Sequence, residues 1–252
     1  MKKSQITVFI IIAVIIVVSF IALMLFFYGR DDDLEEHKDP VDIERINNFV
    51  EECIFQTGED AVYRIGRTGG YSEASKYSTS NDIAYYYDKG RNLLPPKSEI
   101  ENQLALYIKS NLNSCIKDFS DFPHLKITPG ILEPKAVITE NKIIFSAVYP
   151  ITIEKNGETF TLEYFEDIEV KVRLGTIYNA IKEYIIDYQL KNKTICMTCL
   201  FKIALENDLL VELFDLDDET VLFIFRDDKS IIDNMPYRFR FAAKYDHKIE
   251  NV

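Results

Sequence analysis

The feature that most constrains this chain is a stretch without charge near its start, residues 6–28. A helix over these residues would be about 34 Å long, enough to cross a hydrocarbon core of about 30 Å. Lipid offers the backbone no other partners, so a helix is forced there although Ile and Val are poor helix formers in water. We therefore predict a signal-anchor transmembrane helix over residues 1–29, with the lipid bilayer as the partner of residues 6–28.

The charges flanking this stretch predict its orientation. Lys2 and Lys3 precede it, and Asp31 to Asp33 follow it. Positive charge stays on the cytoplasmic side, so residues 31–252 are expected outside the cytoplasm, as the single-pass part of a cell-membrane protein. A cleaved secretory signal is the alternative, but it would have a shorter apolar core and small residues at its end.

The segment "KKSQITVF" resembles the class III signal of archaeal type IV pilins and related surface proteins. The resemblance implies cleavage between Ser4 and Gln5 and a mature helix that packs into a filament core. The chain departs from the family in two ways: Ser4 stands where Gly is commoner, and Gly29 and Pro40 interrupt the helix. A plain, uncleaved anchor therefore remains an alternative. More loosely, the chain resembles uncharacterised single-pass surface proteins of small-genome archaea, which implies a location but no mechanism.

Beyond a charged linker at residues 30–40, the pattern predicts an extracytoplasmic α+β domain over residues 41–252. Its helical part is 41–120. Apolar residues recur at helical spacing to about residue 66, and a second helix begins at Ser98, which forms a capping box with Glu101. A Tyr-rich connection without a clear period joins the two helices.

The strand-rich part is 126–252, where antiparallel β-sheet is expected. Asn156-Gly157 is a strong hairpin signal, and it predicts a three-stranded meander with a bulge or an edge at Pro150. Two helices follow, at 175–190 and 196–207. The last strands are expected at 209–214, 220–225 and 237–245, with polar turns at 215–219 and at Asp227-Asp228.

Four cysteines predict disulfides, since the domain is expected in an oxidising compartment. Cys53 and Cys115 fall on the apolar faces of the two helices, and Cys196 and Cys199 are close in sequence. Three connectivities are open, and we favour 53–115 with 196–199. Free cysteines packed as small apolar residues are the alternative.

The motif "CMTC" at Cys196 and Cys199 also fits a membrane-tethered thiol-disulfide oxidoreductase, because a helix start can activate the first thiol. That function needs a preceding buried strand, whereas "YQLKNKT" precedes the motif. A zinc site would need further ligands, and His37, His124 and His247 are scattered. Residues 215–219 lack the Gly and the distant Glu of a calcium loop. We therefore predict no catalytic residue, no metal and no cofactor.

The net charge and the tyrosines indicate which classes of partner to expect. Residues 31–252 hold 26 basic and 41 acidic side chains, which excludes nucleic acid as an expected partner. Tyrosine suits recognition surfaces, and a cluster in one connection predicts a surface for other envelope proteins or glycans, although these rings could instead pack over a sheet; the cluster is Tyr71, Tyr77, Tyr85, Tyr86 and Tyr87. Asn192 lies in the glycosylation sequon "NKT".

The expected function is therefore that of a non-enzymatic protein of the archaeal cell envelope, with a pilin-like or surface interaction role. The thiol-disulfide oxidoreductase is the alternative.

Overall fold

The computed structural model describes residues 16–21 and 40–246. Contacts divide the chain into two units, residues 1–45 and residues 46–252. In the first unit, residues 16–21 are helical. The remainder of the predicted span over residues 6–28 lies outside the described residues, as do Ser4, Gln5 and most of the predicted linker.

The predicted fold class needs correction at its N-terminal helix. Among the described residues, no helix is both long and apolar enough to cross a membrane. The described part of the predicted span covers residues 16–21 only, which is about 9 Å of helix against a hydrocarbon core of about 30 Å.

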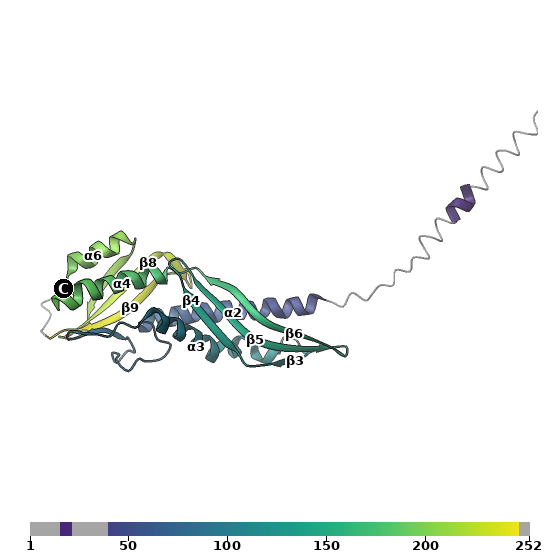
Figure 1. Cartoon of the computed structure of the whole chain (residues 1–252), viewed down its shortest axis with the longest axis horizontal. Coiled ribbons are helices and arrows are strands. Elements are labelled where there is room, and N and C mark those ends of the chain that lie inside the picture. Colours follow the sequence, from purple (N-terminus) through teal and green to yellow (C-terminus); the bar gives the residue numbers. More distant parts are fainter. Residues whose placement is uncertain (1–15, 22–39, 247–252) are drawn as a thin grey trace, which may run out of the picture. The chain divides into compact units, whose positions relative to one another are not determined.

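The second unit is an α+β domain with two sheets (Figure 1). Its helices are α2 (Pro40–Thr68, which begins in the first unit), α3 (Lys97–Ile116), α4 (Leu174–Glu183), α5 (Leu190–Asn192) and α6 (Met197–Glu206), with a 3-10 turn η1 (Lys117–Phe119) and a π-helix η2 (Tyr184–Gln189). The four-stranded sheet contains β3 (Lys126–Pro129), β4 (Glu133–Ile138), β5 (Ile143–Lys155) and β6 (Glu158–Val170). The five-stranded sheet contains β1 (Tyr85–Asp88), β2 (Arg91–Asn92), β7 (Leu210–Asp215), β8 (Thr220–Ile232) and β9 (Met235–Lys244).

The four-stranded sheet confirms the predicted meander of β4, β5 and β6. β5 pairs with β6 along one edge and with β3 and β4 along the other. Asn156 and Gly157 form the turn with positive φ angles of 50° and 84°, which Asn and Gly tolerate best. The register of β5 against β6 shifts between Val148 and Ile151, which is the irregularity expected at Pro150.

The five-stranded sheet has the order β2-β1-β9-β8-β7. β1 runs parallel to β9, so this sheet is mixed, whereas only antiparallel pairs were expected. β1 comes from the Tyr-rich connection, inside the predicted helical part, and it pairs with β9, the last strand that the structure describes. Its strand pattern was hidden because a register shift between Tyr85 and Tyr87 breaks the alternation of buried and exposed side chains.

Helix α2 packs closely on both sheets. A Cβ atom at Gly58 would lie 2.8 Å from the ring of Phe145 on β5, and one at Gly66 would lie 2.7 Å from the carbonyl oxygen of Arg238 on β9. Only glycine allows these approaches, so the two glycines bring the backbone of α2 against both β5 and β9. The domain therefore has one continuous core.

Two helix ends differ from the prediction. α3 begins after Pro96 with no side-chain cap, and Glu101 instead accepts a hydrogen bond from the backbone N–H of Ile138 at 2.9 Å. The predicted helix over 175–190 begins as expected, but its last turns widen into the π-helix η2.

Candidate binding site

Both expected disulfides are present. Cys53 of α2 joins Cys115 of α3, with Cα atoms 5.6 Å apart, and Cys196 joins Cys199. The favoured connectivity is confirmed, and the alternative of free cysteines is wrong.

The surroundings of Cys196 and Cys199 differ from those of a thioredoxin-like motif. Cys196 caps the N-terminus of α6, where its Sγ accepts the backbone N–H of Cys199 at 3.3 Å. The short helix α5 and a left-handed residue, Lys193, precede it, in place of a buried strand. The buried strand that a thioredoxin-like oxidoreductase needs before its motif is therefore missing at Cys196.

The remaining candidates lie at separate positions of the chain. Among the residues that the structure describes, no three His, Cys, Asp or Glu side chains are grouped as metal ligands would be. His37 and His247 lie outside these residues, and Asn192 of the sequon is exposed. Residues 216–219 connect β7 to β8, within the turn predicted at 215–219, but Asp227 is fully buried inside β8, so the second predicted turn was wrong.

The tyrosine cluster separates into core and surface. Tyr86 and Tyr87 are 0 % and 1 % exposed, so the prediction that they belong to an interaction surface was wrong. The register shift in β1 turns both rings inward, where Tyr86 stacks on Phe241 with ring centroids 4.8 Å apart. Burial raises the pKa of the Tyr86 phenol well above its usual value. Tyr71 is half-buried, and its backbone carbonyl accepts a hydrogen bond from Thr68.

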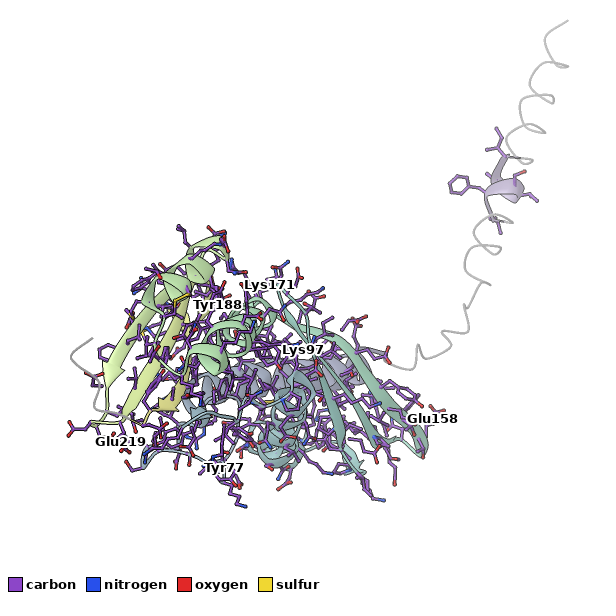
Figure 2. The ribbon with its side chains drawn as sticks, turned by 60° about the vertical axis from the view of Figure 1, so that its left-hand side comes forward. Tyr77, Lys97, Glu158, Lys171, Tyr188 and Glu219 are labelled. Carbon is purple, nitrogen blue, oxygen red and sulfur yellow. A yellow bond between two sulfur atoms is a disulfide. The ribbon has the colours of Figure 1, made fainter. Side chains whose placement is uncertain are left out.

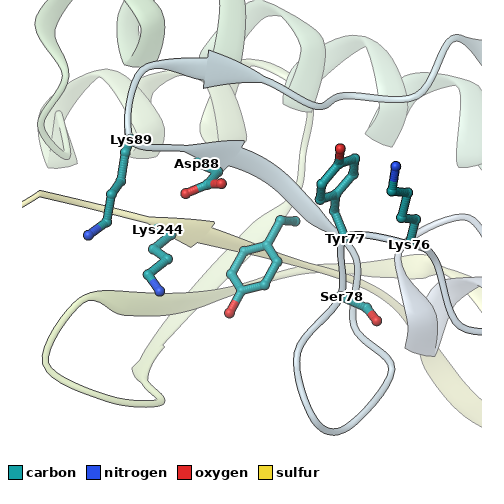
Figure 3. Close-up of a pocket in the computed structure, with 7 residues that line it drawn as sticks. Lys76, Tyr77, Ser78, Asp88, Lys89 and Lys244 are labelled. Carbon is teal, nitrogen blue, oxygen red and sulfur yellow. The ribbon is translucent and has the colours of Figure 1, made fainter.

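Tyr77 and Tyr85 line an open pocket of about 410 Å³ (Figure 3). Its other lining residues are Lys76, Ser78, Asp88, Lys89 and Lys244. We call this site the Tyr77 pocket. It is assembled from the loop before β1, from β1 itself and from the end of β9, so sequence spacing alone could not have brought these residues together.

Backbone hydrogen bonds fix the loop that carries Tyr77. The N–H of Tyr85 donates to the carbonyl of Tyr77 at 2.9 Å, and Ser78 forms an isolated β-bridge with Ala84. The hydroxyl of Thr79 accepts the N–H of Ile83 at 3.2 Å and closes the turn between them. Tyr77 is thereby held beside β1 with 42 % of its surface exposed.

Two cations lie close to the exposed ring of Tyr77. The Nζ of Lys76 lies 5.3 Å from the ring centroid, and the guanidinium carbon of Arg91 lies 5.8 Å from it. Both distances are within the range of cation–π contacts. The structure gives no carboxylate partner for Lys76 among the residues it describes, whereas Arg91 pairs with Asp88.

Glu219 neutralises part of the positive charge of Lys89 and Lys244. Its carboxylate lies 3.0 Å from Lys89 and 3.5 Å from Lys244. The hydrogen bond with Glu219 raises the pKa of Lys89, and the same bond lowers the pKa of Glu219. The residues that line the pocket still carry three lysines against one aspartate, in a chain of net charge −12.

A second pocket, of about 320 Å³, lies at the β5–β6 turn. Figure 2 shows Glu158 at this turn, far from Tyr77. Its lining residues include His124, Lys126 and Glu154, and Lys126 already pairs with Glu154 at 2.8 Å. It lacks an aromatic surface, so the Tyr77 pocket is the stronger candidate.

No family model, curated protein or solved structure matches this chain. The function is therefore inferred from the Tyr77 pocket itself.

Proposed function

We propose that this protein is a non-enzymatic binding module outside the cytoplasm, and that its Tyr77 pocket holds an acidic sugar of a surface glycan. The observation that carries the proposal is the exposed Tyr77 ring, with cations 5.3 and 5.8 Å from its centroid, at an open pocket with a net positive lining. The proposed function is recognition of this ligand, which requires no catalytic side chain in the pocket.

The chemistry of the pocket suits such a ligand. The aromatic faces of Tyr77 and Tyr85 offer flat apolar surface, and their hydroxyl groups can bond to sugar hydroxyls. Lys76 has no carboxylate partner among the described residues and can bind the acid group of the ligand. A neutral sugar would leave this charge unused.

The disulfides support a location outside the cytoplasm. Two disulfides in one chain are rare in reducing compartments and common in secreted or surface domains. The exposed sequon at Asn192 is compatible with the same location.

A direct test measures binding of a panel of acidic monosaccharides by ligand-observed NMR, using uronic acids, N-acetylneuraminic acid and sugar sulfates. At least one should bind the full chain with a dissociation constant on the order of 1 mM, and its neutral counterpart should bind at least about fivefold more weakly. Tyr77→Ala should weaken binding by about fivefold or more, because the ring and its cation contacts are lost.

Tyr164→Ala is the matched control, because Tyr164 is 62 % exposed on β6 of the other sheet. It should leave binding unchanged. Equal binding of acidic and neutral sugars, or equal binding by the Tyr77→Ala variant, would rule out the proposed ligand or the proposed pocket.

A further inference from the structure

A row of cations continues from the Tyr77 pocket along β9. Side chains on a strand alternate between faces, so Arg238, Arg240 and Lys244 point to one face of the sheet. Tyr237, Phe239 and Phe241 point to the other face, into the core. Lys244 also lines the Tyr77 pocket. We call Arg238, Arg240 and Lys244 the β9 basic row.

The row is long compared with the pocket. Lys244 is six positions after Arg238, which corresponds to about 20 Å along a strand. Neighbouring cations are therefore about 7 to 13 Å apart. A ligand that contacts the whole row must be extended.

Two like charges face each other across the strands at Arg238. Arg226 of β8 lies directly opposite Arg238 in the register, and like charges in this position destabilise a sheet. Glu212 lies 3.4 Å from Arg226 and 3.9 Å from Arg238, and Arg226 also pairs with Asp228. Arg238 therefore shares one carboxylate with Arg226, at the longer of the two distances, and its side chain is 45 % exposed.

The positive charge of Arg240 is compensated even less than that of Arg238. Burial lowers its pKa, and the positive charges of Arg67 and Arg238 lower it further. Its Nε is buried and has no hydrogen-bond partner among the described residues. An anion near the partly exposed guanidinium of Arg240 would relieve the repulsion by Arg67 and Arg238.

An apolar floor joins the pocket to the arginines. Ala242, between Arg240 and Lys244, is fully buried, and the floor consists of its half-buried cross-strand neighbours, Tyr85 of β1 and Leu222 of β8. Tyr85 is itself part of the Tyr77 pocket. The faces of sugar rings can pack on such a surface while their acid groups reach the cations.

We infer that the ligand is an extended acidic polysaccharide that runs from the Tyr77 pocket along the β9 basic row to Arg238. This inference rests on the proposed function and adds the length and direction of the ligand. Duplex nucleic acid carries a charge about every 1.7 Å, much denser than this row, and the net charge of −12 opposes it. A glycan with one acid group per sugar or disaccharide fits the wider spacing.

The test uses the full chain and oligogalacturonates of increasing length, with affinity measured by fluorescence anisotropy. Affinity should rise with length until the oligomer spans about 20 Å and then level off. Arg238→Gln with Arg240→Gln should weaken the longest oligomer about tenfold and leave galacturonic acid itself unaffected.

Lys135→Gln with Lys171→Gln, which removes two exposed cations outside the five-stranded sheet, is the control with the same change in charge. Because Arg240 is partly buried, Arg238→Gln alone is tested as well, and thermal unfolding checks that each variant folds. The single variant should give a smaller loss of the same kind.

The outcomes separate the two proposals. If galacturonic acid binds but longer oligomers gain nothing, or if the arginine variants equal the control, the extended ligand is wrong and the pocket stands. If Tyr77→Ala leaves all binding intact, the proposed function is wrong. Equal affinity for polyglutamate or for a single-stranded DNA oligonucleotide would contradict the assignment to a polysaccharide.

Discussion

At the scale of single residues, the buried carboxylate of Asp227 joins the two sheets. Arg173, which follows β6 and caps α4, places its Nε 3.4 Å from Asp227 of β8. Ser230 donates to the same carboxylate, and the backbone N–H of Arg173 donates to Ser230 at 2.9 Å. A terminal nitrogen of Arg173 also reaches the carbonyl of Asn207 at 2.6 Å.

Removing Asp227 should strongly destabilise the fold. Asp227 is 0 % exposed and Arg173 14 %, so Asp227→Ala leaves a largely buried guanidinium without its anion. We expect a loss of about 3–5 kcal/mol in the free energy of unfolding, measured by urea titration. Asp228→Ala is the matched control, since Asp228 pairs with Arg226 in a more exposed position, and it should cost less than about 1 kcal/mol. Similar losses for the two variants would contradict a specific role for the buried pair.

The sequence could not distinguish these two neighbouring aspartates. Two consecutive acids after an apolar run are typical of a turn, and the partner of Asp227 lies far away in the sequence at Arg173. The same limit applies to Tyr86 and Tyr87, because a register shift turns two consecutive rings inward. Local pattern predicts exposure well only where the strand is regular.

At the scale of elements, α2 and α3 were predictable because each has a long apolar face, and their cysteines fall on those faces. The capping of α3 was not predictable. Glu101 binds the end of β4 and not the N-terminus of its own helix, and Lys97 donates to the carbonyl of Ile138 at 3.1 Å. A contact with a distant strand thus replaces the local capping box. β1 was missed for a related reason, because it depends on pairing with β9.

The disulfide between α2 and α3 should be the more stabilising of the two. It closes a loop with a sequence separation of 62 residues, against 3 for Cys196–Cys199. In the chain-entropy model these loops correspond to about 4 and about 2 kcal/mol. Cys53→Ala with Cys115→Ala should therefore lower the free energy of unfolding more than Cys196→Ala with Cys199→Ala does. Urea unfolding checks the order, and the reverse order would refute the entropic account for this chain.

At the scale of the whole molecule, charge is distributed unevenly. The sequence shows the acidic excess, which argues against nucleic acid, but it does not show that cations from the loop before β1 and from β9 converge. One signal was available: "YRFRFAAKY" alternates, and this pattern predicts Arg238, Arg240 and Lys244 on one face. Their connection to Tyr77 depends on the parallel pairing of β1 with β9, which the sequence pattern does not reveal.

The same uneven charge predicts how stability depends on pH. Three carboxylates near the five-stranded sheet have lowered pKa values: Asp208 through a hydrogen bond from Lys229, Asp217 through the backbone N–H of Glu219, and Glu219 through Lys89. A group with a lowered pKa in the folded state stabilises the fold above its unfolded pKa, about 4, and loses this contribution as the pH falls through the folded value. Glu59 acts in the opposite direction, because burial raises its pKa.

Three carboxylates with a lowered pKa outnumber the one with a raised pKa. The free energy of unfolding should therefore decrease as the pH falls from about 5 to about 2. Thermal unfolding followed by circular dichroism across this range should show a falling midpoint temperature. Glu219→Gln should make the fall shallower, since it removes the group that two lysines hold in its charged form. Glu133→Gln, an exposed change on β4, is the matched control for the loss of one carboxylate. A midpoint temperature at pH 2.5 equal to or above that at pH 5 would mean that the ion pairs around Glu219 contribute nothing to the fold, and the cations of the Tyr77 pocket would then have to be held in place by the backbone alone.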